Sequence, residues 1–170
     1  MATNPKTVQY IDFGYPSAAD FWNDVVVPAN ARYASDPTRR HAIEVSFSAW
    51  HVVDWLFHEQ RPAVALAEFQ RKRIGECPEL GWIRDVCDAG KHRGLSLRVP
   101  AVQRVGKGVR PVSFTNNAGE IITFVNDASQ PVQFTAEGPL EIELADKSRH
   151  AFAVVLGVVM DYWRTNWFKP

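Results

Sequence analysis

Residues 140–163 read LEIELADKSRHAFAVVLGVVMDYW, and the apolar residues in this stretch follow first the spacing of a strand and then that of a helix. Its first five residues alternate apolar side chains with glutamate, which is the pattern of a strand with one face buried. After Asp146, which we expect to cap a helix, apolar residues recur at helical spacing to about Trp167. These residues are Phe152, Val155, Leu156, Val159, Tyr162 and Trp163. The stretch therefore predicts a strand followed by a final helix, 146–168, that packs back on earlier parts of the chain.

The preceding segment consists of short alternating runs separated by turn residues. The turns are expected at Gly106-Lys107-Gly108, Asn116-Asn117-Ala118-Gly119, Asn126-Asp127 and Glu137-Gly138-Pro139. Alternation favours strands, and Gly, Asn, Asp and Pro favour the tight turns that join antiparallel neighbours. We therefore expect a small antiparallel β meander over 95–145. Its strands would be Val99–Val105, Arg110–Thr115, Ile121–Val125, Val132–Thr135 and Leu140–Leu144.

Residues 17–94 carry the start and stop signals of helices. Ser17 followed by Asp20 predicts a capped first helix, which Pro28 is expected to kink or end. Three later signals place a proline where a new helix would begin. They are Asp36-Pro37, opening a helix to about Gln60; Arg61-Pro62, opening one from Ala63 to about Arg73; and Cys77-Pro78, opening one that ends near Gly90 to Gly94.

Together these patterns predict an α+β fold that is mainly α. We expect a helical bundle with the small antiparallel β meander inserted before the C-terminal helix. No long linker or repeat divides the chain, so 1–170 is expected to form a single domain.

Composition limits the classes of function. Nineteen Lys and Arg balance nineteen Asp and Glu, which argues against a general nucleic-acid coat protein. The charge is uneven, however: residues 61–110 hold eleven basic and five acidic side chains, so a phosphate-bearing partner would bind there. Two cysteines, Cys77 and Cys87, are too few for a disulfide scaffold and are expected to be small packing residues. The most apolar run, Ala151–Met160, is too short to span a bilayer, and we expect a soluble cytoplasmic protein without membrane contact.

The predicted second helix contains a polar stripe that could bind a metal ion. His51, Asp54 and His58 are three and four residues apart, so their side chains can converge beside the helix. Two imidazoles and a carboxylate suit zinc or manganese, with a further ligand from His92, Asp88 or His150. The alternative is a structural network in which Asp54 orients a histidine and no cofactor is bound. Phe47 and Trp55 lie in the same stripe, so we expect another helix, a second subunit or a ligand to cover it.

The predicted fourth helix places a second set of polar residues on one face. Arg84, Asp88 and His92 are spaced at i, i+4 and i+8, flanked by Asp85 and Lys91. Arg84 could bind a phosphate, and His92 could transfer a proton near neutral pH, which together suit metal-independent cleavage of RNA. Lys91 and Arg93 would add contacts to the substrate. The alternative is a surface ladder of ion pairs with little effect on stability.

An arginine, a polar residue directly after it and a later histidine on one helix of a helical bundle resemble the HEPN superfamily of bacterial ribonucleases and defence or toxin proteins. The matching positions are Arg84, Asp85 and His92, although the seven residues between Arg84 and His92 exceed the spacing of the family motif. The resemblance implies a homodimer whose paired helices bring two Arg/His sets into one cleft. The phrases 49–59 and 83–92 also resemble a group of uncharacterised bacterial proteins.

Three functions are therefore expected in order of preference. The first is a HEPN-like protein that binds or acts on RNA or a nucleotide, with Arg84 and His92 central and with His51, Asp54 and His58 in a supporting role. The second is a non-catalytic protein-interaction module, in which the covered aromatic and polar face of the predicted second helix is a protein interface. Separately, the C-terminal aromatic residues Trp163, Trp167 and Phe168 suggest a dimer contact. The third is a metal-dependent hydrolase that uses His51, Asp54 and His58.

Overall fold

The structure, a computed structural model, describes residues 15–91, 99–115, 117–123 and 128–169. It is an α+β fold with a small antiparallel sheet, as the sequence predicts. The helical elements before the sheet are α1 (Ala18–Phe21), a π-helical turn η1 (Trp22–Val26), α2 (Val27–Ser35), α3 (Arg39–Gln60), α4 (Leu66–Glu76) and α5 (Pro78–Lys91). The strands are β1 (Val102–Val112), β2 (Phe114–Thr115), β3 (Ile121–Ile122), β4 (Phe134–Leu144) and β5 (Arg149–Ala151), followed by helix α6 (Phe152–Asn166).

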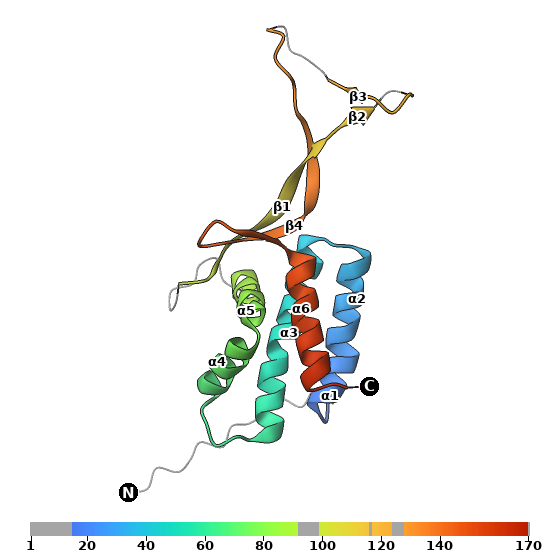
Figure 1. The fold of residues 1–170 in the computed structure, drawn as a ribbon. Helices are drawn as coiled ribbons and strands as arrows, with labels where there is room; N and C mark the ends of the chain where they lie inside the picture. Colours follow the sequence, from blue (N-terminus) through green and yellow to red (C-terminus); the bar gives the residue numbers. More distant parts are fainter. Residues whose placement is uncertain (1–14, 92–98, 116, 124–127, 170) are drawn as a thin grey trace, which may run out of the picture.

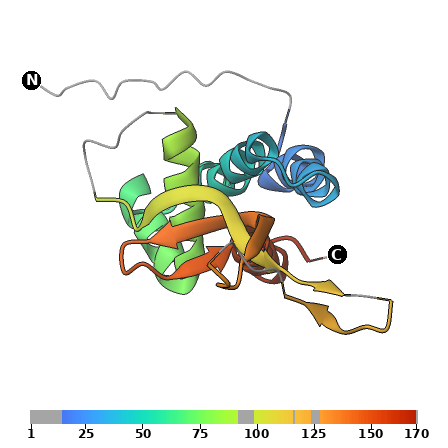
Figure 2. The same cartoon turned by 90° about the horizontal axis from the view of Figure 1, so that it is seen from above.

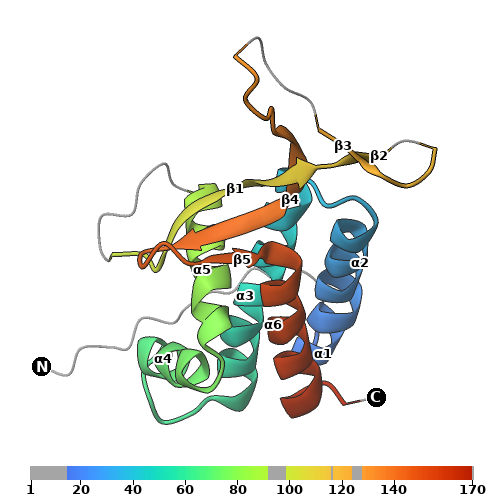
Figure 3. The ribbon, with the colours of Figure 1, turned by 45° about the horizontal axis from the view of Figure 1, so that its top comes forward.

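Helix α3 makes contacts with most of the other helices. It packs against α1, α2, α4, α5 and α6, and the sheet of β1, β4 and β5 lies across one end of the helices (Figure 1, Figure 3). Leu140, Ile142 and Leu144 of β4 are buried, while the glutamates between them are partly exposed. The alternation read from the sequence therefore does mark a strand with one face on the core. Within the described residues, no helix is both long and apolar enough to cross a membrane.

The first helical segment differs from the expectation at Pro28. Ser17 caps α1 as predicted, because its hydroxyl accepts a hydrogen bond from the backbone N–H of Asp20. The chain then passes through the wide turn η1 and continues as α2 to Ser35, with Pro28 in the first turn of α2. A proline is tolerated there because the π-helical turn before it already changes the hydrogen-bonding pattern.

Two helix starts also lie later than predicted. Thr38, rather than Asp36, caps α3, and its side chain accepts from the backbone N–H of His41. Helix α4 begins at Leu66 instead of Ala63. The end of α3 and the start of α5 are confirmed, with Arg61 adopting a left-handed conformation (φ 47°) after the last turn of α3.

The expected five-strand meander is wrong in its connectivity. The two predicted turns at 106–108 and 137–139 lie inside strands, so β1 and β4 form one long antiparallel pair from Val102/Leu144 to Val112/Phe134. The glycines instead accompany a register shift between Lys107 and Val109. A Cβ atom on Gly138 would lie 3.1 Å from the backbone carbonyl carbon and oxygen of Gly108, so a side chain there would require the two strands to move apart by a few tenths of an ångström.

The final helix begins six residues later than predicted. Asp146 does not cap it; its carboxylate accepts from the backbone N–H of Ser148 in a turn between β4 and β5. Strand β5 separates this turn from α6, which starts at Phe152. The predicted apolar face of α6 does pack on the core, and the indole N–H of Trp163 donates to the backbone carbonyl of Ala49 on α3 at 3.1 Å.

The C-terminal aromatic residues pack within the chain instead of forming a free surface cluster. Trp163 is fully buried, and the Phe168 ring stacks on Trp22 with a centroid separation of 4.8 Å. The ring of Trp167 lies 5.2 Å from the guanidinium carbon of Arg73 on α4. These residues close the core at the end of α6, which removes the reason for expecting a dimer contact there.

Candidate functional site

The two sequence-predicted polar sets meet where α5 packs against α3. The ammonium group of Lys91 lies 3.3 Å from Nε2 of His51 and 4.7 Å from the centre of the Phe47 ring. Seven residues earlier on α5, the guanidinium carbon of Arg84 lies 5.6 Å from the centre of the Trp50 ring on α3. We call this contact region the α3–α5 seam. Its residues are Phe47, Trp50, His51 and Asp54 on α3 and Arg84, Cys87, Asp88 and Lys91 on α5.

The hydrogen bonds of His51 define its tautomer. Nδ1 lies 2.7 Å from the backbone carbonyl oxygen of Phe47, and a carbonyl can only accept, so Nδ1 carries the hydrogen. The lone pair of Nε2 then accepts a hydrogen bond from the Lys91 ammonium group. Lys91 is therefore held by an imidazole and an aromatic ring, at the exposed end of the seam.

Asp54 is the acidic member of α3 in this region. One carboxylate oxygen accepts a hydrogen bond of 3.1 Å from the side-chain amide of Gln70 on α4, and the other lies 4.0 Å from Nε2 of His51. His58 is exposed, and its ring meets the edge of Phe57. In the part of the chain that the structure describes, no three His, Cys, Asp or Glu side chains are arranged to hold a metal ion.

Arg84 and Asp85 have different surroundings although they are neighbours. The Arg84 side chain is 27% exposed and its Nη2 lies 3.7 Å from Asp85 Oδ1. Asp85 is buried, and its other oxygen accepts hydrogen bonds from the backbone N–H groups of Ala101 (2.7 Å) and Val102 (3.2 Å). Asp85 thus joins α5 to the start of β1. His92 and Arg93, which the sequence analysis links to Arg84, lie outside the described residues.

Elements of the same chain cover the aromatic residues in the polar stripe of α3. Phe21 of α1 stacks on Trp55 at 5.0 Å, and Tyr15 meets Trp55 edge-on. A Cβ atom on Gly90 of α5 would lie 3.3 Å from the Phe47 ring. Of the three expected covers, another helix is therefore the one observed over Phe47 and Trp55.

The remaining candidate residues, Cys77, Cys87 and His150, pack against other parts of the chain. Burial raises the pKa of the Cys77 and Cys87 thiols from 9.0 to about 11, so neither is an activated nucleophile. This agrees with their expected role as small packing residues. His150, the third possible extra metal ligand, lies on β5 with its ring 4.9 Å from that of Trp82.

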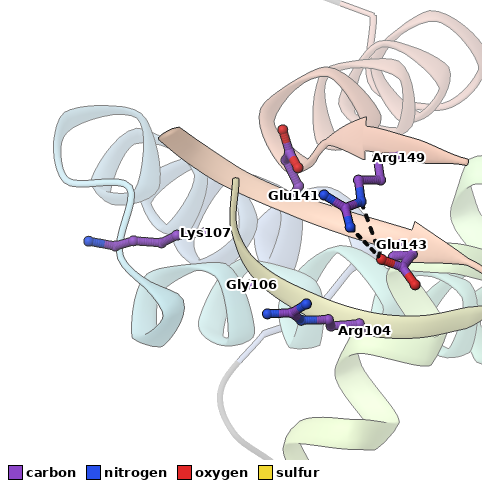
Figure 4. Close-up of a pocket in the computed structure, with 6 residues that line it drawn as sticks. All are labelled: Arg104, Gly106, Lys107, Glu141, Glu143 and Arg149. Atoms are coloured by element: carbon purple, nitrogen blue, oxygen red, sulfur yellow. Dashed lines mark hydrogen bonds and ion pairs between the residues drawn. The ribbon is translucent and has the colours of Figure 1, made fainter. Parts of the chain in front are cut away.

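Sequence reasoning missed a charged cavity of about 20 Å³ on the partly exposed face of the sheet (Figure 4). Its lining residues are Arg104, Gly106, Lys107, Glu141, Glu143 and Arg149. Glu143 accepts from both Nε (3.2 Å) and Nη2 (3.1 Å) of Arg149, and Lys107 pairs with Glu137. These pairs neutralise most of the charge, so the cavity has no preference for an anionic or cationic ligand. The sequence pattern that could have indicated this cavity is the alternation of glutamates with apolar residues in β4.

Comparisons with protein-family models, with curated proteins and with solved structures found no match to this chain. The functional argument therefore depends on the residues and their geometry.

Proposed function

We propose that this chain binds or cleaves RNA, or binds a nucleotide, at the α3–α5 seam, in the manner of a HEPN-like protein of a bacterial defence or toxin system. The observation that carries the proposal is the meeting of Lys91 with His51, because it joins the two polar sets found in the sequence. Arg84 lies seven residues before Lys91, two helical turns away on the same side of α5.

The chemistry of these side chains suits a phosphate ligand. An arginine offers paired N–H donors to phosphate oxygens, and a lysine adds a compact positive charge. Packing on Trp50 and the buried Asp85 restricts Arg84, so this donor is positioned before a ligand binds. Lys91 ends the described part of α5, and Arg93, the other proposed substrate contact, follows two residues later in the sequence.

The reaction that follows is transesterification of RNA without a metal ion. His92 would accept the proton of a ribose 2′-hydroxyl as its oxygen attacks the adjacent phosphorus atom. The bond from phosphorus to the 5′ oxygen breaks, water protonates the leaving oxygen, and a cyclic phosphate remains on the other fragment. Arg84 and Lys91 would stabilise the negative charge that develops on the phosphate oxygens.

The proposal includes the assembly and location that the resemblance implies. We propose a bundle-type helical arrangement, a homodimer and a cytoplasmic location. The metal-dependent alternative stays a separate proposal, which the manganese arm of the test addresses, although no three described His, Cys, Asp or Glu side chains are arranged to hold a metal ion.

The test is incubation of the purified protein with a mixed RNA pool in excess EDTA, and separately with manganese. We expect cleavage in EDTA and a loss of about a hundredfold or more in His92→Ala, the usual effect of removing a general base. His41→Ala is the matched control, because this histidine lies in the first turn of α3, outside the seam, and should leave the rate unchanged. Wild-type cleavage by His92→Ala would contradict the catalytic assignment.

The binding part of the proposal has its own measurement. Fluorescence anisotropy with a labelled RNA should show weaker binding for Arg84→Ala and Lys91→Ala, and partial recovery for Arg84→Lys, which restores charge but not the paired donors. Affinity equal to that of the wild type in both alanine variants would exclude the seam as the phosphate site.

A further inference from the structure

The paired strands β1 and β4 continue beyond the helices and carry an unusual surface. Figures 1 and 2 show this extension and the short β2–β3 ribbon projecting away from the helical body. We call residues 109–115, 117–123 and 128–139 the distal hairpin. None of its residues with a described side chain is buried. It nevertheless carries several large apolar residues that are exposed: Val109 (70%), Phe114 (41%), Ile121 (72%), Ile122 (41%) and Val132 (39%).

Two physical properties of the distal hairpin favour its packing on another surface. A two-stranded ribbon without a buried face is at best marginally stable in water. Phe114 and Ile122 are a directly opposed pair, so they lie on the same face of the β2–β3 ribbon. Clustered exposed apolar residues on a projecting element mark an interaction site. The distal hairpin therefore has the composition of an element that packs on another surface.

Charge limits the chemistry of that surface. Residues 109–139 contain one arginine, no lysine and three carboxylates: Glu120, Asp127 and Glu137. Glu137 is paired with Lys107, which leaves a single arginine against two carboxylates, so the segment has no cluster of cations to hold the phosphates of nucleic acid or anionic lipid. An uncharged, apolar protein surface is the occupant that fits such a segment.

Helix α6 presents such a surface on this same chain. Val154 is 66% exposed and Val158 is 43% exposed, and their spacing of four residues places them on one face. Ala153 and Gly157 are exposed beside them, and no charged residue occurs from Phe152 to Met160. A Cβ atom on Gly157 would meet nothing within 4 Å, so this face is open to an approaching element.

We propose that the distal hairpin of one copy packs on the exposed face of α6 in a second copy, and that the exchange is reciprocal. This inference rests on the homodimer proposed above and assigns its surface. A second copy fits better than an unrelated protein, because a two-fold pair covers both hairpins and both α6 faces at once. A stable interface buries about 1,200 Å² or more in total, so each of the two equivalent contacts would supply about half.

The first experiment measures oligomeric state by light scattering and sedimentation over a wide range of protein concentration. We expect the wild-type chain to be a dimer and both Ile121→Asp and Val154→Asp to weaken dimerisation at least tenfold. Val64→Asp is the matched control, because Val64 is a similarly exposed valine outside both surfaces and should leave the dimer intact. Circular dichroism confirms folding, and Ile121→Thr, which keeps a β-branched residue, repeats the test if Ile121→Asp fails to fold.

The outcomes separate the inference from the homodimer itself. A wild-type monomer at all concentrations would overturn both. A wild-type dimer that is unaffected by either substitution would overturn only the assigned surface and leave a homodimer formed elsewhere. RNA cleavage is measured independently, so its absence does not bear on the oligomeric result.

Cross-linking tests the pairing of the two surfaces directly. Chains with Ile121→Cys are mixed with chains with Val154→Cys, and oxidation should form a disulfide between the two different chains. Each variant alone should cross-link much less, since the contact joins the hairpin to α6. The native thiols of Cys77 and Cys87 are buried, so they do not compete. Equal cross-linking in all three samples would overturn the assigned contact.

Discussion

The carboxylate Oδ2 of Asp85 lies 2.7 Å from the backbone nitrogen of Ala101, and this contact fixes the start of the sheet on the helices. A second N–H, that of Val102, donates to the same oxygen at 3.2 Å. The start of β1 therefore lies beside the middle of α5. The residue that the resemblance places in a catalytic motif also holds two layers of the fold together.

Replacing Asp85 should destabilise the protein whatever its activity. Asp85→Ala leaves the N–H of buried Val102 without its acceptor, so we expect the free energy of unfolding to fall by about 2–4 kcal/mol. Asp85→Asn keeps an acceptor oxygen and should cost about half as much. Urea unfolding measures both, with Asp24→Ala as an exposed control. Wild-type stability in Asp85→Ala would show that the contact contributes nothing.

A second prediction concerns the buried cation of α4. The Arg73 guanidinium carbon lies 4.8 Å from the Phe69 ring and 5.2 Å from the Trp167 ring, and Nη1 lies 3.1 Å from Glu76. We expect Arg73→Ala and Trp167→Ala each to lower the free energy of unfolding by about 2–3 kcal/mol. A double-mutant cycle should give a coupling of about 1 kcal/mol between them. Additive effects would mean that the two side chains do not stabilise each other, and Arg71→Ala is the exposed control on the same helix.

The two opposed glycines in the β1–β4 pair should differ in their tolerance of alanine. A Cβ atom on Gly138 meets the backbone of Gly108 at 3.1 Å, and backbone atoms of a paired strand cannot easily move. A Cβ atom on Gly108 meets the carboxylate end of Glu141, which can rotate away. We expect Gly138→Ala to cost about 1–3 kcal/mol and Gly108→Ala less than about 1 kcal/mol. Thermal unfolding checks the order, and the reverse order would contradict the strand approach described here.

Stability should decline at alkaline pH because of the two buried thiols. Burial raises the pKa of Cys77 and Cys87 from 9.0 to about 11. Between these values the unfolded chain loses thiol protons that the folded chain keeps, so the unfolded state binds fewer protons and unfolding becomes more favourable. The contribution of these thiols is therefore complete below pH 9 and decreases up to about pH 11. Urea titrations across this range should show a smaller decline in the Cys77→Ala/Cys87→Ala variant; an equal decline would assign it to other groups.

Tyr162 should add to that decline at still higher pH. Its hydroxyl donates to Glu76 at 2.6 Å, and burial together with this hydrogen bond raises its pKa well above 10.0. Unfolding releases the hydroxyl to water, where it ionises at lower pH, so the free energy of unfolding again decreases as the pH rises. Tyr162→Phe should lower stability at neutral pH and flatten the alkaline decline, which spectrophotometric titration of the phenol can follow.

The sequence identified the helices well because their signals are local. Ser17 caps α1, Pro78 begins α5, and the apolar spacing from Phe152 to Trp163 marks the buried face of α6. Capping and periodicity depend only on neighbours within a few residues, so they can be read without knowing the fold. For the same reason the polar faces of α3 and α5 could be identified from the sequence, whereas the contact between the two helices could not be predicted.

The errors arose where a distant segment decides the local structure. Gly106–Gly108 and Glu137–Pro139 have the composition of turns, yet both lie inside paired strands. At the register shift between these strands, Gly138 approaches the backbone of Gly108 closely, which favours glycine. Asp146 has the composition of a helix cap but closes a turn between two strands. In each case cross-strand pairing took precedence over local propensity.

The sequence by itself determined the α+β class, the approximate positions of the helices along the chain and the residues able to carry chemistry, because these follow from local spacing and side-chain type. Only the tertiary structure decided that Lys91 meets His51, that Asp85 binds the start of β1, and that α1 and α5 cover the aromatic face of α3. Those contacts join residues far apart in the chain, and their formation depends on how whole elements pack against one another.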